Sequence, residues 1–130
     1  MRCFAFVKNS EGKIILTKAK SSEKKGEGYE GIWSMLGNTV EFGETCEEAL
    51  RREVKEDLGV DISDIALINY NDYIKDGKHW LAIDFSAKTE EKAQNLEEDK
   101  NEEVACFECR EVPENISPYT RECCKLLGKP

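Results

Sequence analysis

One segment, residues 44–60 with the sequence ETCEEALRREVKEDLGV, constrains the fold more than any other part of the chain. Thr45 is followed three positions later by Glu48, which is the pattern of a capping box at the start of a helix. Gly59 is a typical residue at the end of a helix. These signals predict one helix that begins near Thr45 and ends before Gly59.

The acidic residues of this predicted helix lie in an unusual place. At about 100° per residue, the side chains of Leu50, Val54 and Leu58 form an apolar arc that should face a core. Glu53 and Asp57 fall inside or beside this arc. Carboxylates spaced three or four positions apart repel one another, and removing them from water costs more free energy unless a cation is present. A bound divalent metal ion is the simplest explanation.

An ordinary solvated helix face is the alternative to a metal site. In that case the carboxylates would pair with the basic residues Arg51, Arg52 and Lys55 of the same helix. The basic residues project elsewhere on the helical wheel, and Glu53 shares its arc with Leu50. The sequence therefore favours the metal site.

Size and charge limit the class of protein. The 130 residues suffice for one domain, and their net charge of −8 argues against long nucleic acids as partners. A small anionic substrate remains compatible, because a metal ion and a few lysines reverse the sign locally. The chain has neither an apolar run of about 18 residues nor a typical signal peptide. We therefore expect a cytoplasmic protein that does not bind membranes.

The order of predicted elements indicates an α/β fold. Strands alternate with two helices, and the segments 21–31 and 89–103 are polar or acidic and predict exposed loops. This order favours a mixed sheet with helices packed on it. The predicted strands are residues 2–8, 13–20, 33–36, 65–73, 79–88 and 104–110, and the predicted helices are 44–60 and 117–128.

The six cysteines favour buried reduced thiols over a zinc site. Cys106 and Cys109 form a C-x-x-C pattern, but on a strand they would point to opposite faces of the sheet. Cys123 and Cys124 likewise diverge on a helix. Neither pair presents its sulfur atoms to one metal ion.

The helix and the residues before it resemble the Nudix box, G-x5-E-x7-R-E-U-x-E-E-x-G-U, where U is a bulky aliphatic residue. Asp57 replaces the second Glu of the acidic pair, Asn38 replaces the first Gly, and Leu36 replaces a Pro that usually precedes the box. The positions that match are Glu44, Arg52, Glu53, Val54, Glu56, Gly59 and Val60. The resemblance implies a single Nudix hydrolase domain over residues 1–130. Its expected fold is an α/β/α sandwich, with helices on both faces of a mixed sheet.

A second likeness, over residues 69–113, is to the branch of this family that acts on nucleoside triphosphates. The matching residues are Asn71, Asp72, Lys78, His79, Asn95, Glu97, Lys100, Glu102, Glu103 and Pro113. It implies Mg²⁺-dependent hydrolysis of a nucleoside triphosphate, or a related nucleoside diphosphate derivative, to a nucleoside monophosphate and pyrophosphate. Cys106 stands where that branch has an aromatic residue that could stack on a base, so the base preference stays open.

The resemblance also implies a ligand set for Mg²⁺, or for Mn²⁺ in its place. Glu53, Glu56 and Asp57 are the expected metal-facing carboxylates, and the carbonyl of Gly37 is a further candidate ligand. Carboxylates and carbonyls are the ligands that magnesium prefers.

The remaining catalytic roles also follow from the resemblance. Arg52 is expected to hold a carboxylate in place, and Glu44 to support the geometry between loop and helix. Glu53 is the first candidate for the general base, as well as a ligand. Glu102 and Glu103 are the second candidates for the base and for additional metal ligands.

Five residues are candidates for substrate binding, each with a structural alternative. Lys18 and Lys20 could reach a triphosphate or simply form a solvated strand edge, and Trp33 could stack on a base or pack in the core. His79 could bind substrate or be a hydrogen-bonded strand residue, and Asn71 matches the triphosphate branch.

Three further possibilities stay open. The substrate could be ADP-ribose or another nucleoside diphosphate derivative, and the protein could form a homodimer. It could also be a non-catalytic nucleotide-binding regulatory module. Leu36 and Asn38 motivate this last hypothesis because they alter the turn that presents a carbonyl to the metal.

Overall fold

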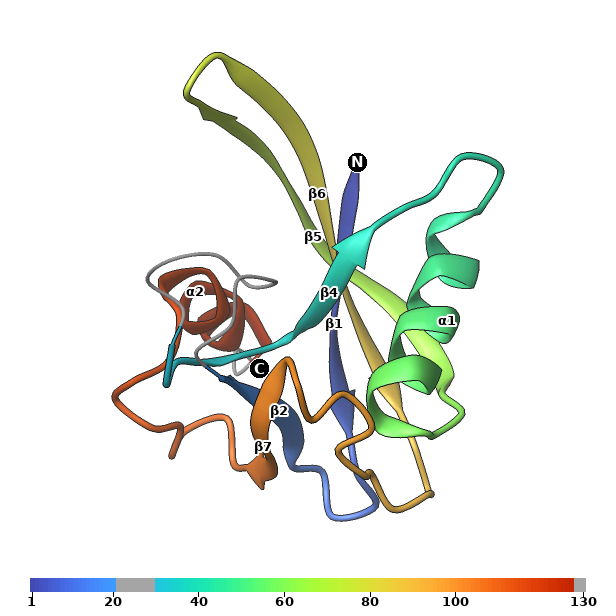
Figure 1. Ribbon diagram of the computed structural model, residues 1–130, viewed down its shortest axis with the longest axis vertical. Coiled ribbons are helices and arrows are strands. Elements are labelled where there is room, and N and C mark those ends of the chain that lie inside the picture. The colour runs from blue at the N-terminus through green and yellow to red at the C-terminus, as the bar shows by residue number, and fades with distance from the viewer. Residues whose placement is uncertain (21–29, 128–130) are drawn as a thin grey trace.

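The computed structural model describes residues 1–20 and 30–127, which form a mixed sheet with one helix on each face (Figure 1). The sheet has seven strands in the described part of the chain. The elements are β1 (Arg2–Lys8), β2 (Ile14–Ala19), β3 (Trp33–Ser34), β4 (Leu36–Thr39), α1 (Cys46–Leu58), β5 (Ser63–Lys75), β6 (Lys78–Lys88), β7 (Asn101–Phe107) and α2 (Pro118–Leu127).

Strand β1 organises the sheet because three strands pair with it. Along one edge it pairs in parallel with β6, from Arg2 opposite Ala82 to Lys8 opposite Lys88. The other edge is shared, because β4 pairs antiparallel with residues 2–5 and β2 with residues 7 and 8. Strand β2 continues into pairs with β3 and β7, and β5 pairs with β6. The predicted mixed sheet is therefore confirmed.

The two faces of the sheet carry separate cores. Side chains alternate along a strand, so Cys3, Ala5 and Val7 of β1 pack under α1, whereas Phe6 of β1 packs under α2. Fully burying a Val or Phe side chain stabilises the fold by about 1.5–3 kcal/mol. The prediction that helices cover both faces is confirmed, as Figure 1 shows.

Helix α1 begins and ends with the predicted signals. Thr45 Oγ1 accepts a hydrogen bond from the backbone N–H of Glu48 at 3.1 Å, and the Glu48 carboxylate accepts one from the N–H of Thr45 at 3.1 Å. Gly59 has φ of 71°, and its N–H donates to the carbonyl of Lys55 at 3.0 Å. A left-handed residue at this position favours glycine, so the helix ends where the sequence predicts.

Two predicted strands differ from the structure. The segment 33–36 is not one strand, because the N–H of Met35 donates to Thr120 Oγ1 of α2 at 3.0 Å and separates β3 from β4. The strand predicted at 104–110 begins earlier, at Asn101, and ends at Phe107. Most of the predicted loop 21–31, and Gly128 at the end of the last predicted helix, lie outside the described residues.

Strands β5 and β6 form a hairpin that extends away from the rest of the sheet (Figure 1). Its turn is Asp76–Gly77, with φ of 52° and 73°, as a two-residue hairpin turn requires.

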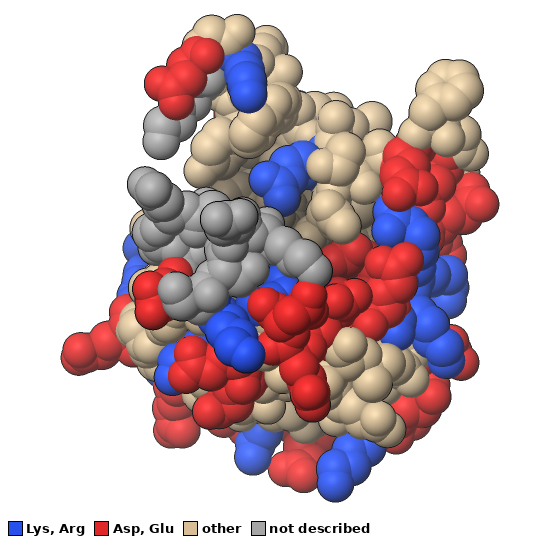
Figure 2. Space-filling model, viewed as in Figure 1, with Lys and Arg blue, Asp and Glu red and all other residues tan. Residues whose placement is uncertain are grey.

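On the face shown in Figure 2, acidic side chains gather in the centre with Lys and Arg scattered among them. Neither helix in the described residues is long and apolar enough to cross a membrane.

Candidate active site

Helix α1 buries two carboxylates against the sheet. The exposed fractions of Glu53 and Asp57 are only 2% and 4%, because both side chains share the inward face of the helix with Leu50 and Val54. The helical wheel predicts this placement, and the structure confirms it. Burial of two like charges requires compensation.

Lys100 and Asn38 supply this compensation. The Lys100 Nζ atom lies 3.2 Å from Asp57 Oδ1 and 3.5 Å from Glu53 Oε1. Asn38 Nδ2 donates a hydrogen bond to Glu53 Oε2 at 2.8 Å. Lys100 comes from the acidic segment before β7, which the sequence predicts only as an exposed loop. A cation thus lies between the two carboxylates that should face a metal.

The local charges shift the pKa values of this group. Burial, together with the negative charge of Glu53, raises the pKa of Asp57 to about 6, although Lys100 opposes this change. Burial lowers the pKa of Lys100, but the charges of Asp57 and Glu53 raise it by more, so the net shift is upward. The protonated Lys100 is therefore matched to its two anionic neighbours.

A bidentate ion pair holds the loop before α1 against the helix. Arg52 Nε and Nη2 donate to the two carboxylate oxygens of Glu44 at 2.8 and 3.0 Å. These hydrogen bonds lower the pKa of Glu44 and raise the pKa of Arg52. Glu44 also accepts the backbone N–H of Glu41 at 2.9 Å. This geometry fits the supporting roles expected for Arg52 and Glu44.

Glu56 lies apart from the buried pair. Its side chain is 51% exposed, and Oε2 is 3.6 Å from Arg52 Nη1. Among residues 1–20 and 30–127, no three Asp, Glu, His or Cys side chains are grouped so that they could hold a metal ion. Glu53 and Asp57 are the two carboxylates that the structure brings together.

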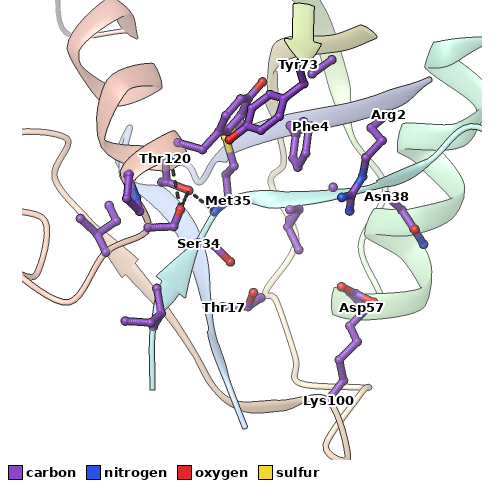
Figure 3. Close-up of a pocket in the computed structure, with 18 of the residues that line it drawn as sticks. Arg2, Phe4, Thr17, Ser34, Met35, Asn38, Asp57, Tyr73, Lys100 and Thr120 are labelled. Carbon is purple, nitrogen blue, oxygen red and sulfur yellow. Dashed lines mark hydrogen bonds and ion pairs between the residues drawn. The ribbon is translucent and has the colours of Figure 1, made fainter. Parts of the chain in front are cut away.

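A cavity of about 910 Å³ extends from Asp57 to the α2 face of the sheet, and Glu53 does not line it. Figure 3 shows Asp57 and Lys100 at one end, and Arg2, Phe4 and Tyr73 at the other. We call these the carboxylate end and the aromatic end. The aromatic end is completed by Trp80 of β6 and Tyr119 of α2.

Gly37 and Asn38 of β4 form part of the wall between the two ends. A Cβ atom on Gly37 would overlap the ring of Phe4 on the neighbouring strand. Glycine is thus required here by the close packing of β4 against β1.

None of the five predicted substrate-binding residues lines this cavity. Lys18 pairs with Glu102 at 3.5 Å, and Lys20 Nζ donates to the carbonyl of Glu98 at 3.4 Å. Trp33 is buried in the core under α2, where its ring meets Phe107 edge-on. His79 is exposed on the hairpin, with Nε2 2.9 Å from Asp72 Oδ1.

The remaining predicted residues are also placed. Asn71 lies behind the aromatic end, where its Nδ2 donates to Asp84 Oδ2 at 3.2 Å. Glu102 and Glu103 are exposed on β7, and Glu102 lines a separate cavity of about 510 Å³ together with Lys20. Neither glutamate lines the first cavity.

Several cavity residues escape prediction from the sequence. Lys100 carries a signal, because it matches a position of the family pattern, but nothing in the local sequence of Arg2 or Phe4 marks them. Tyr119 reads as an ordinary apolar residue of α2. Asp84 is fully buried behind the cavity and accepts hydrogen bonds from Tyr119 Oη, Asn71 Nδ2 and Cys123 Sγ.

Comparison with known proteins supports a family assignment. A family model described as the NUDIX domain matches residues 2–127. The nucleoside triphosphatase NudI of Salmonella schwarzengrund (strain CVM19633) is 47% identical over 49 residues, which are 36% of this chain and 35% of the relative. The match thus spans about a third of the length of this curated relative.

Solved structures resemble the chain over nearly its whole length. The MutT NUDIX hydrolase from Burkholderia pseudomallei has a TM-score of 0.81 and 26% identity, covering 97% of this chain and 95% of that one. The NUDIX domain of Shewanella oneidensis NrtR, complexed with ADP ribose, has a TM-score of 0.74 at 13% identity, covering 97% and 84%. The second likeness shows a shared fold alone. The family model and the buried acidic helix agree with the predicted resemblance, and the chain belongs to the NUDIX domain family.

Proposed function

We propose that this protein hydrolyses nucleoside triphosphates, or related nucleoside diphosphate derivatives, in a Mg²⁺-dependent reaction. With a triphosphate, water adds across the anhydride between the α- and β-phosphates and releases a nucleoside monophosphate and pyrophosphate. The observation that carries this proposal is the pair of buried carboxylates, Glu53 and Asp57, of which Asp57 lines one end of a large cavity. The partial match to a nucleoside triphosphatase supports the substrate class.

The donor set at the carboxylate end fits a magnesium ion. Glu53 and Asp57 provide oxygen ligands, and one cation, the ammonium of Lys100, already lies between them. Glu56 and the Gly37 carbonyl are the further ligands we propose. A bound Mg²⁺ or Mn²⁺ would neutralise phosphate charge and favour ionisation of a water molecule.

The protein side chains have separate roles in this proposal. Glu53 accepts the proton of the attacking water, and Asn38 fixes the orientation of its carboxylate through the 2.8 Å hydrogen bond. Glu102 and Glu103 are the second candidates for this base. Arg52 and Glu44 hold the preceding loop against α1 through their two hydrogen bonds. The aromatic end receives the base, since flat rings stack on aromatic side chains.

A nucleotide panel with product identification tests this function. Purified protein is incubated with Mg²⁺ and ribo- and deoxyribonucleoside triphosphates, and products are separated chromatographically. We expect monophosphate and pyrophosphate, with a loss of about 10²–10⁴ in kcat for Glu53→Gln. Glu47→Gln is the matched control, because Glu47 is an exposed residue of the same helix. Full activity in Glu53→Gln, or no product from any nucleotide, would overturn the proposal.

The same panel separates the two other functions. ADP-ribose as the preferred substrate would give AMP and ribose phosphate, and the likeness to a domain complexed with ADP ribose motivates its inclusion. Nucleotide binding in Mg²⁺ without turnover, measured by calorimetry, would favour a regulatory module. Asn38 in place of glycine motivates that measurement.

A further inference from the structure

Arg2 projects from β1 into the cavity, and its guanidinium lies between Phe4 and the level of Asn38 (Figure 3). Its backbone pairs with Thr39 of β4 and Ala82 of β6, which fixes its position in the sheet. The side chain lies on the same face of β1 as Phe4, and both residues line the cavity (Figure 3). Arg2 is thus a cation placed by three strands rather than by a loop.

The guanidinium of Arg2 is held by rings instead of carboxylates. Its Cζ atom is 5.4 Å from the centroid of the Phe4 ring and 5.9 Å from that of Trp80. No ion pair to Arg2 exists within the described residues, and its buried Nε has no hydrogen-bond partner. By contrast, Arg52 forms two hydrogen bonds with Glu44. The Nε atom has essentially no exposed surface, so a ligand would meet the two Nη groups, which make no hydrogen bond or ion pair within the described residues and belong to a residue that lines the cavity.

The surroundings of Arg2 suit a flat, uncharged ring. Tyr73 and Trp80 stack with their centroids 6.3 Å apart, and the rings of Phe4 and Tyr119 are 4.8 Å apart. Tyr119 is held by its hydrogen bond to the buried Asp84. Because phosphates would be drawn to the opposite, metal-binding end, the group that reaches Arg2 is the base.

We propose that Arg2 selects nucleobases that present two adjacent hydrogen-bond acceptors. The guanidinium is a planar fork of N–H donors and binds such a pair in bidentate fashion. Guanine offers N7 beside O6, and cytosine offers N3 beside O2. Adenine places an amino group beside N7, and uracil and thymine place an N–H between their two carbonyls. This inference rests on the proposed nucleotide substrate, and it names the class of base that the site prefers, which includes guanine and cytosine.

Binding of nucleoside monophosphates tests the inference apart from catalysis. Monophosphates lack an anhydride bond, so titration calorimetry with GMP, CMP, AMP and UMP in EDTA measures recognition without turnover. We expect GMP or CMP to bind roughly tenfold to a hundredfold more tightly than AMP and UMP, as a bidentate contact with a base predicts.

Two substitutions separate the fork of Arg2 from its charge. Arg2→Gln removes both, whereas Arg2→Lys keeps the charge and removes the fork. In both variants the ratio between the preferred base and AMP should fall to within about twofold, with an unchanged unfolding temperature. Arg110→Gln, at an exposed position of the chain, is the matched control and should retain the wild-type ratio.

Three results would overturn the inference. These are equal binding of all four monophosphates by the wild type, a preference for AMP or UMP, and an equal loss for every base in Arg2→Gln. The last result would place Arg2 on the phosphate or the sugar. Base selectivity in EDTA without hydrolysis of any triphosphate would instead leave the inference standing and remove the proposed enzymatic function.

Discussion

Two buried aspartates, one at each end of the cavity, are neutralised in different ways. Asp57 at the carboxylate end lies 3.2 Å from the ammonium of Lys100. Asp84 behind the aromatic end accepts hydrogen bonds from the neutral groups of Tyr119, Asn71 and Cys123, and no described cation pairs with it. Burial raises the pKa of both carboxyls.

This difference indicates different roles for the two aspartates. Asp57 can exchange its cation for a metal ion, whereas Asp84 holds neighbouring side chains in place. A carboxylate that is paired with a lysine ammonium can exchange this cation for a metal ion, because the total charge of the site is then still compensated. A carboxylate surrounded by neutral donors holds those donors in place and gains little from a cation. We therefore expect substitutions at Asp57 to change chemistry, and those at Asp84 to change stability and positioning.

The largest expected effect is a difference in kcat between substitutions at Asp57 and at Asp84. Asp57→Asn should lower kcat by at least about a hundredfold, because it removes a metal ligand. Asp84→Asn should leave kcat within about threefold and raise KM, because Asp84 only positions Tyr119. Steady-state kinetics with the nucleotide found in the panel measures both. Equal losses in kcat would contradict the distinction.

Removal of Lys100 tests whether its cation is exchangeable. Lys100→Met should destabilise the metal-free protein by about 2 kcal/mol, less than a fully buried pair would lose, because solvent reaches the ammonium. Mg²⁺ should then raise the unfolding temperature of the variant more than that of the wild type. Thermal unfolding in EDTA and in Mg²⁺ measures this difference, with Lys92→Met as an exposed control from the same acidic segment. An identical Mg²⁺ shift in variant and wild type would show that Lys100 does not compete for the site.

Loss of one donor to Asp84 should have a smaller effect. Tyr119→Phe removes the hydroxyl that donates to this carboxyl and leaves the hydrogen bonds from Asn71 and Cys123. We expect a loss of about 1 kcal/mol in the free energy of unfolding, measured by urea denaturation. Tyr70→Phe, at an exposed position of β5, should change it very little. Equal stability of the two variants would mean that the Asp84 contact contributes nothing.

The smallest expected effect is a change in how stability depends on pH. Burial raises the pKa of Asp84 in the folded protein, so its contribution is fully present below about pH 4 and is lost as the pH rises through the folded pKa. The free energy of unfolding of Asp84→Asn, minus that of the wild type, should therefore rise with pH across this range. Urea denaturation at several pH values measures the slope.

The two titratable side chains that contact Asp84, Tyr119 and Cys123, do not add to this change of stability with pH. Burial and the Asp84 carboxyl hold the pKa of Tyr119 above its usual range and raise that of Cys123 to about 12, so both stay protonated throughout the range. Asp61→Asn replaces an exposed aspartate and is the control. Its free energy of unfolding should change with pH in the same way as that of the wild type. A flat difference for Asp84→Asn would mean that this carboxyl has the same pKa in the folded and unfolded states.

The carboxylate end could be predicted because it depends on local periodicity. Glu53 and Asp57 lie on one helix, and the positions of Thr45 and Gly59 fix where that helix starts and ends. A helical wheel therefore suffices to place both carboxylates against the core. The sequence does not reveal Lys100 as their partner, because its contact joins α1 to a loop more than 40 positions later.

The aromatic end could not be predicted because it depends on strand order. Arg2 meets Trp80 only because β1 pairs in parallel with β6, and Tyr119 of α2 contacts Phe4. A sequence pattern predicts strands but not which of them are neighbours. The break at Met35 has the same origin, since the hydrogen bond that its N–H donates to Thr120 of α2 determines it.

The parallel pairing of β1 with β6 has a consequence during synthesis on the ribosome. Strand β1 leaves the exit tunnel before β6 and cannot complete this pairing until β6 has been made, because Arg2 pairs with Ala82. Distant pairings of this kind form slowly, so the nascent chain exposes the apolar residues of β1 while the hairpin is still being translated. Chaperones that shield extended apolar segments would therefore act on the first half of this chain more than on the second.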